Sequence, residues 1–81
     1  MEFEIGREYH RPGLFGPSFW VVCVERTETT AKFISEGWLS ETEIDPGAYA
    51  TLDIEHDGDT EVCECWEYRG HRGYIRADNR F

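Results

Sequence analysis

The chain has 81 residues, of which 17 are acidic and 8 are Lys or Arg, so its formal net charge is −9 at pH 7. This length suffices for one domain with a modest hydrophobic core, and we expect residues 1–81 to form a single domain without a deep catalytic cleft. The negative charge argues against direct binding to nucleic acid or to anionic lipid, because both ligands require Lys and Arg for neutralisation.

The N-terminal region predicts a short strand followed by a loop. Phe3 and Ile5 alternate with acids, which favours a strand that can resume through Tyr9. Residues 11–17 contain two prolines and two glycines, which prevent a regular ladder of hydrogen bonds. We therefore expect this segment to be a turn-rich loop.

The central region predicts a hairpin and at most one short helix. Residues 18–28 and 29–35 are rich in β-branched and aromatic side chains, and a tight turn at 26–28 would let them pair antiparallel. Residues 40–43 have the form of a capping box, but a proline and a glycine follow closely. One short helix near 40–46, or an irregular loop in its place, is expected there.

The second half predicts three further strands. Four apolar residues alternate with polar ones, as in a strand with one buried face: Ala48, Ala50, Leu52 and Ile54. The sequence His-Asp-Gly-Asp at 56–59 favours a hairpin turn, and the next strand is expected over residues 60–68. A turn at 69–73 and a last short strand at 74–76 complete the pattern. We thus predict a mostly β protein, a small antiparallel barrel or curled sheet of five or six strands of the SH3-like or OB-like kind.

Short motifs give the chain a resemblance to known proteins. The segment Val22–Phe33 carries an Arg26-Thr27 turn between two strands, and Glu61-Val62 and residues 74–77 accompany it. In these motifs the chain resembles small uncharacterised β proteins of bacteria and their phages or mobile elements. The resemblance implies a compact β fold and a phage or mobile-element setting in a bacterial host, with no catalytic residue.

The charge is segregated along the sequence. Residues 33–68, here called the acid-rich tract, contain eleven acids and no Lys or Arg. Carboxylates two residues apart on a strand recur at about 6.8 Å, given a rise of about 3.4 Å per residue, which is close to a phosphate-like spacing. One interpretation is DNA mimicry, with these candidate partner-binding acids: Asp53, Glu55, Asp57, Asp59, Glu61, Glu41 and Glu43. The other is a solvated face that only keeps the protein soluble.

Apolar side chains offer a second kind of candidate site. Leu14 and Phe15, at the tip of the Gly- and Pro-rich loop, and Trp38, beside Gly37, could each anchor a partner. The alternative is that Leu14 and Phe15 fold back as a lid over the core. The tryptophans are explained as packing residues unless a site recruits them.

The cysteines and histidines give only a weak metal signal. Cys63, Cys65 and His71 are the candidate zinc ligands, with Cys23 and His56 as further donors. However, a Cys-x-Cys spacing differs from the Cys-x-x-Cys of structural zinc sites, and buried thiols explain the cysteines more simply. We expect no metal and no cofactor.

Catalysis and export also have little support. No nucleophile elbow, phosphate loop or helix-borne metal pair is present, so we expect no enzyme activity. The first residues carry two acids where a secretory signal needs basic residues, and the odd number of cysteines fits a reducing compartment. A cytoplasmic protein is predicted.

Two functional hypotheses follow. In the first, the chain is an acidic inhibitor that occludes the basic groove of a nucleic-acid-binding protein, with a CRISPR effector nuclease as the first target class to test. In the second, it is a small β interaction module that binds through aromatics such as Trp20, Trp38 and Phe15, while its acids only solubilise it. An exposed strand edge could also support a homodimer.

Overall fold

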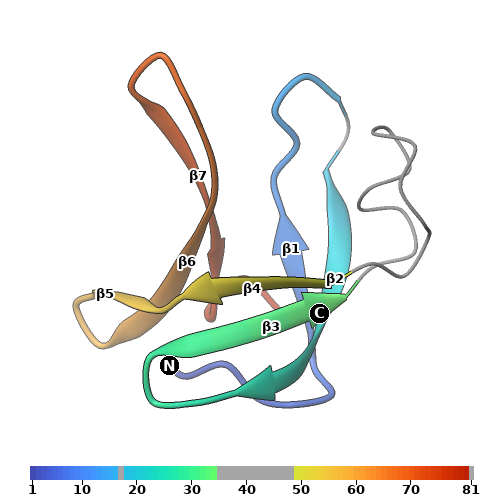
Figure 1. Ribbon diagram of the computed structural model, residues 1–81, viewed down its shortest axis with the longest axis vertical. Helices are drawn as coiled ribbons and strands as arrows, with labels where there is room; N and C mark the ends of the chain where they lie inside the picture. Colours follow the sequence, from blue (N-terminus) through green and yellow to red (C-terminus); the bar gives the residue numbers. More distant parts are fainter. Residues whose placement is uncertain (17, 35–48, 81) are drawn as a thin grey trace.

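The computed structural model describes residues 1–16, 18–34 and 49–80, and within these ranges it has seven strands and no helix (Figure 1). In chain order the strands are β1 (Glu8–Arg11), β2 (Phe19–Arg26), β3 (Thr30–Ile34), β4 (Tyr49–Asp53), β5 (Glu55–Asp57), β6 (Thr60–Tyr68) and β7 (His71–Arg76). They form two antiparallel sheets, with strand orders β1-β2-β3-β4 and β5-β6-β7. The mostly β fold is confirmed, the strand number is higher than predicted, and the helix predicted near 40–46 lies outside the described residues. No helix in the described ranges is long and apolar enough to cross a membrane.

The predicted barrel is wrong, because the two sheets do not close into one. On one side the chain runs directly from β4 into β5 through Ile54, whose amide donates to the Thr29 carbonyl at 2.8 Å. On the other side, β1 meets the C-terminal segment in a single bridge between Tyr9 and Arg80, and the His10 amide donates to the Asn79 carbonyl. Among the described strands no continuous ladder joins β1 to β7. The result is a pair of curled sheets.

Two-residue turns set the register of the second sheet. At Gly58-Asp59 only Gly58 has a positive φ, 66°. This matches a type II′ turn and not a type I′ turn, which requires positive φ at both central residues. At Arg69-Gly70 both residues have positive φ, 50° and 84°, as a type I′ turn requires. Both turns are shorter than predicted, so β5 continues to Asp57 and β7 already starts at His71.

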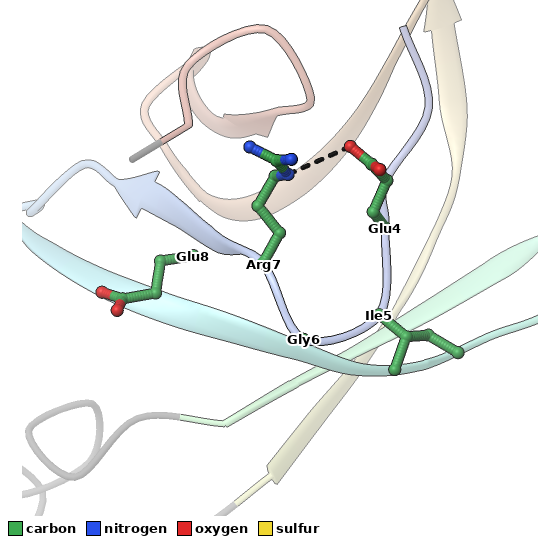
Figure 2. A pocket seen from close by; sticks show the side chains of 5 residues that line it. All are labelled: Glu4, Ile5, Gly6, Arg7 and Glu8. Carbon is green, nitrogen blue, oxygen red and sulfur yellow. Dashed lines mark ion pairs between the residues drawn. The ribbon is translucent and has the colours of Figure 1, made fainter.

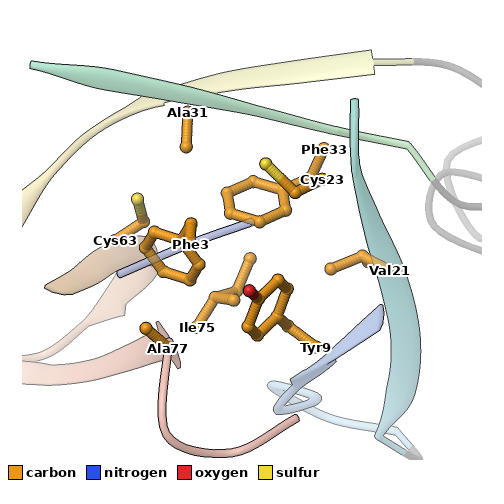
Figure 3. Close-up of a cluster of buried hydrophobic side chains, with 9 residues drawn as sticks. All are labelled: Phe3, Tyr9, Val21, Cys23, Ala31, Phe33, Cys63, Ile75 and Ala77. Carbon is orange, nitrogen blue, oxygen red and sulfur yellow. The ribbon is translucent and has the colours of Figure 1, made fainter. Parts of the chain in front are cut away.

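The core lies between the two sheets and is centred on aromatic rings (Figure 3). Phe3 lies edge-on to Tyr9 and to Phe33, with ring centroids 5.0 and 5.2 Å apart. Aromatic pairs prefer this edge-to-face arrangement. The remaining buried members are Val21, Cys23, Ala31, Cys63, Ile75 and Ala77. The strand expected from Phe3 is wrong: the chain turns at Gly6, with φ 89°, and β1 begins only at Glu8. Phe3 is nevertheless a core residue.

Candidate partner-binding surface

An exposed acidic edge lies where β4 passes into β5. Leu52 and Ile54 turn inward and pack against the core, as the period-two pattern predicts, while Asp53 and Glu55 are exposed. Asp59 is exposed in the turn that follows β5. No Lys or Arg of the described ranges forms an ion pair with any of these three acids. Asp53, Glu55 and Asp59 are here called the acidic edge.

The fold brings arginines from outside the acid-rich tract onto other members of it. Arg76 pairs with Asp57, Nη1 to Oδ2 at 2.8 Å, and Arg72 pairs with Glu64, Nε to Oε1 at 3.2 Å. Such exposed pairs contribute little to stability, but they do neutralise the carboxylates locally. Asp57, predicted as a partner-binding acid, is therefore exposed yet already paired.

Glu61, predicted as a partner-binding acid on the acidic surface, is buried and not part of the exposed acidic edge. Only 5% of the residue is exposed; its Oε1 accepts from the Phe3 amide at 2.9 Å, and its Oε2 pairs with Arg26 Nη2 at 2.6 Å. The Glu61 amide also donates to the carbonyl of Met1. The N-terminal segment thus covers the face of β6 that would otherwise meet water. Residues 60–63 are all buried, and Cys63 belongs to the core.

A small open cleft adjoins the acidic edge. It has a volume of about 230 Å³ and is lined by Thr51, Leu52, Asp53, Glu55 and Glu64. Three of these five side chains are carboxylates, and the lining contains no His, Cys or Lys. The cleft can attract a cationic group, but its lining provides no nucleophile paired with a base.

A second hollow lies at the turn before β1. It has a volume of about 410 Å³ and is lined by Glu4, Ile5, Gly6, Arg7 and Glu8. Arg7 Nε pairs with Glu4 Oε2 at 3.0 Å, while the side chains of Ile5 and Glu8 point away from that pair (Figure 2). Because these groups do not converge on a common point, the hollow has no arrangement suited to acid-base catalysis.

The predicted apolar anchors are solvent-exposed rather than folded onto the core. Leu14 is 39% exposed and Phe15 is 81% exposed. The Phe15 ring contacts Tyr68 edge-on, with centroids 5.1 Å apart. The alternative of a lid over the core is therefore wrong for Phe15. Trp38, Glu41 and Glu43 lie outside the described residues.

The candidate zinc ligands are dispersed. Cys63 is fully buried, the Cys65 thiol donates to the Gly73 carbonyl at 3.4 Å, and His71 is exposed at the start of β7. Burial, together with the nearby charge of Glu61, raises the pKa of the Cys63 thiol to about 12, so it remains protonated. The described residues include no group of three or more His, Cys, Asp or Glu side chains that could share a metal ion.

Comparisons with known proteins do not add a relative. No family model, no curated protein and no solved structure matches the chain. The resemblance to small β proteins of bacteria and mobile elements therefore stays a prediction. The functional argument rests on the surface described above.

Sequence reasoning missed one part of this surface, the tip of the β6–β7 hairpin. Tyr68 is 39% exposed, and the guanidinium of Arg69 lies over its ring, 5.2 Å from the ring centroid. The sequence pattern places Tyr68 at the end of a strand and Arg69 in the turn that follows, with no binding role for either. One signal was available: Arg occupies a turn position where Asn or Gly is the usual residue.

Proposed function

We propose that the chain is a non-enzymatic binding protein whose acidic edge docks onto the basic nucleic-acid-binding groove of a partner protein. One observation carries the proposal. Asp53, Glu55 and Asp59 are exposed without an ion-pair partner in the described ranges, whereas Asp57 and Glu61 are neutralised by arginines. Within the described ranges, the acids of the acid-rich tract that are exposed and form no ion pair are thus those of the acidic edge and Glu67 on β6.

The spacing of the charges favours electrostatic steering over close imitation of DNA. Double-stranded DNA carries one charge per roughly 1.7 Å of its axis, while alternate carboxylates on a strand recur only about every 6.8 Å. The acidic edge is therefore less densely charged than the nucleic acid that it would replace. The net charge of −9 supplies a long-range field that can guide the edge to a basic groove and raise the association rate.

The proposed target is a nuclease of a bacterial host. An inhibitor encoded by a phage or mobile element would act in the bacterial cytoplasm, and a CRISPR effector nuclease offers a long basic channel for the heteroduplex that it holds. We propose this class of nuclease as the first target to test. Binding there would exclude nucleic acid by occupying its site.

The test compares two variants that lose the same amount of charge. The edge variant combines Asp53→Asn, Glu55→Gln and Asp59→Asn. The control variant combines Glu8→Gln, Glu25→Gln and Glu67→Gln, three exposed acids on other strands. Each is used with the native chain to capture proteins from a nuclease-treated bacterial lysate, and captured nucleases are then assayed for cleavage at several salt concentrations.

We expect the native chain and the control variant to capture and inhibit the same basic nuclease, and the edge variant to lose both effects. Inhibition should weaken as salt rises and as competing nucleic acid is added. If the edge variant retains the partner, the acids only solubilise the protein. The alternative function, an aromatic interaction module, would then be favoured by the 81% exposure of Phe15.

A further inference from the structure

The β1–β2 loop and the β6–β7 hairpin point toward the same end of the molecule (Figure 1). Contact between Phe15 and Tyr68 joins them into an exposed apolar patch that also includes Leu14. Phe15, Tyr68, Leu14 and the adjoining Arg69 are here called the tip patch. Exposed aromatic rings held next to a guanidinium are typical of protein-binding hot spots.

Arg69 is exceptional among the basic residues of the described ranges. Its guanidinium lies over the Tyr68 ring, and it forms no ion pair within those ranges. Six other basic residues do have carboxylate partners: Arg7, Arg26, Lys32, Arg72, Arg76 and Arg80. In a chain with about twice as many acids as bases, an arginine that forms no ion pair with any described residue and lies beside exposed rings is available to an external anion.

The backbone conformation of Arg69 also supports a binding role for this residue. Its φ of 50° lies in the left-handed region, which disfavours side chains other than Asn, Asp or Gly. A type I′ turn would form more readily from Asn-Gly than from Arg69-Gly70. Folding alone therefore does not explain arginine at this position, and such local conflicts occur preferentially at functional sites.

The tip patch is also held in place before any partner binds. Trp66 Nε1 donates to the Pro12 carbonyl at 3.0 Å, which ties the β1–β2 loop to the β6–β7 hairpin. The Trp66 ring lies directly against Gly73, where any Cβ would overlap it. Because the two loops are already fixed, less conformational entropy is lost on binding.

We propose that the tip patch docks a partner segment in which an apolar side chain lies beside a carboxylate. The apolar group would pack on Phe15 and Tyr68, and the carboxylate would accept hydrogen bonds from Arg69, whose planar fork suits it. A nucleic acid strand could also stack its bases on the rings and place a phosphate at Arg69. However, the net charge of −9 repels a polyanion far more than a single carboxylate. This site is separate from the acidic edge and does not depend on the function proposed above.

The test uses a short synthetic peptide in which Glu alternates with Leu and Phe, titrated to millimolar concentration into the full ¹⁵N-labelled chain. Control ligands are the same peptide with Lys in place of Glu and a single-stranded oligothymidylate. The decisive variant is Arg69→Asn, which should keep or improve the type I′ turn. Phe15→Ser removes an exposed ring without touching the core.

We expect the acidic peptide to shift the amide signals of Phe15, Tyr68 and Arg69 in a saturable way. Arg69→Asn should weaken its binding at least about tenfold while thermal stability is unchanged or higher, and Phe15→Ser should weaken it similarly. The proposal is overturned if the acidic peptide does not bind, if the Lys peptide or the oligonucleotide binds more tightly, or if Arg69→Asn binds as well as the native chain.

Discussion

Glu61→Gln should destabilise the protein strongly, although the sequence places this residue in a run of surface acids. Gln can still accept from the Phe3 amide, but it removes the charge that faces Arg26 at 2.6 Å. Removing one partner of a buried ion pair typically costs about 3–5 kcal/mol. Because the Arg26 side chain is 23% exposed and also pairs with Glu2, we expect the lower end, about 3 kcal/mol. Marginal domains have only about 5–15 kcal/mol in total.

The assay is urea unfolding at pH 7, followed by circular dichroism, with Glu55→Gln as the matched control. Both variants lose one negative charge from the same hairpin, but Glu55 is exposed and has no ion-pair partner in the described ranges. The control should therefore change the free energy of unfolding by less than about 0.5 kcal/mol. A second comparison adds Arg26→Met to each background.

The double-mutant cycle separates the ion pair from other effects. If Glu61 and Arg26 interact as described, Arg26→Met should cost less in the Glu61→Gln background than in the native chain, with a coupling of at least about 1 kcal/mol. Equal costs in both backgrounds, or a Glu61→Gln variant as stable as Glu55→Gln, would refute the reasoning. The N-terminal segment would then not depend on this carboxylate.

Three further predictions follow from other contacts. Gly73→Ala should cost about 1–3 kcal/mol in urea unfolding, because its methyl group would displace the Trp66 ring; an unchanged midpoint would contradict the packing. The Cys63 thiol stays protonated in the folded chain, whereas in the unfolded chain it ionises above about pH 9. The free energy of unfolding should therefore fall between about pH 9 and 12, by up to about 1.4 kcal/mol per pH unit. Cys63→Ala should reduce that slope, measured by unfolding at several pH values. Arg76→Gln would leave the β5 carboxylate Asp57 unpaired and should speed association with a basic partner at low salt, measured by surface plasmon resonance; a slower rate would argue against the acidic edge.

Much of the strand pattern could be predicted because one face of each strand meets the core. The strand over residues 60–68 was predicted with its observed bounds, and β2 and β3 differ from their predicted ranges by one or two residues. Leu52 and Ile54 pack inward as their alternation indicates. Where a single buried face decides the structure, period two in the sequence is sufficient.

The misses share a cause, which is contact between segments far apart in the chain. Glu61 reads as one more acid in an alternating run, and only the distant Arg26 and Phe3 turn it inward. The barrel failed to close because β1 meets the C-terminal segment in one bridge, and strand patterns carry no information on closure. Likewise, the pairing of Phe15 with Tyr68 joins two loops whose proximity no local motif could indicate.

The passage of the chain through Ile54 links the unfolding of the two sheets. This single residue separates β4 from β5, its amide is bonded to Thr29, and its side chain packs on the shared core. Neither sheet can therefore open far without disturbing the other. The slowest amide protons of β2 and of β6 should exchange with the same free energy of opening, as parts of one cooperative unit.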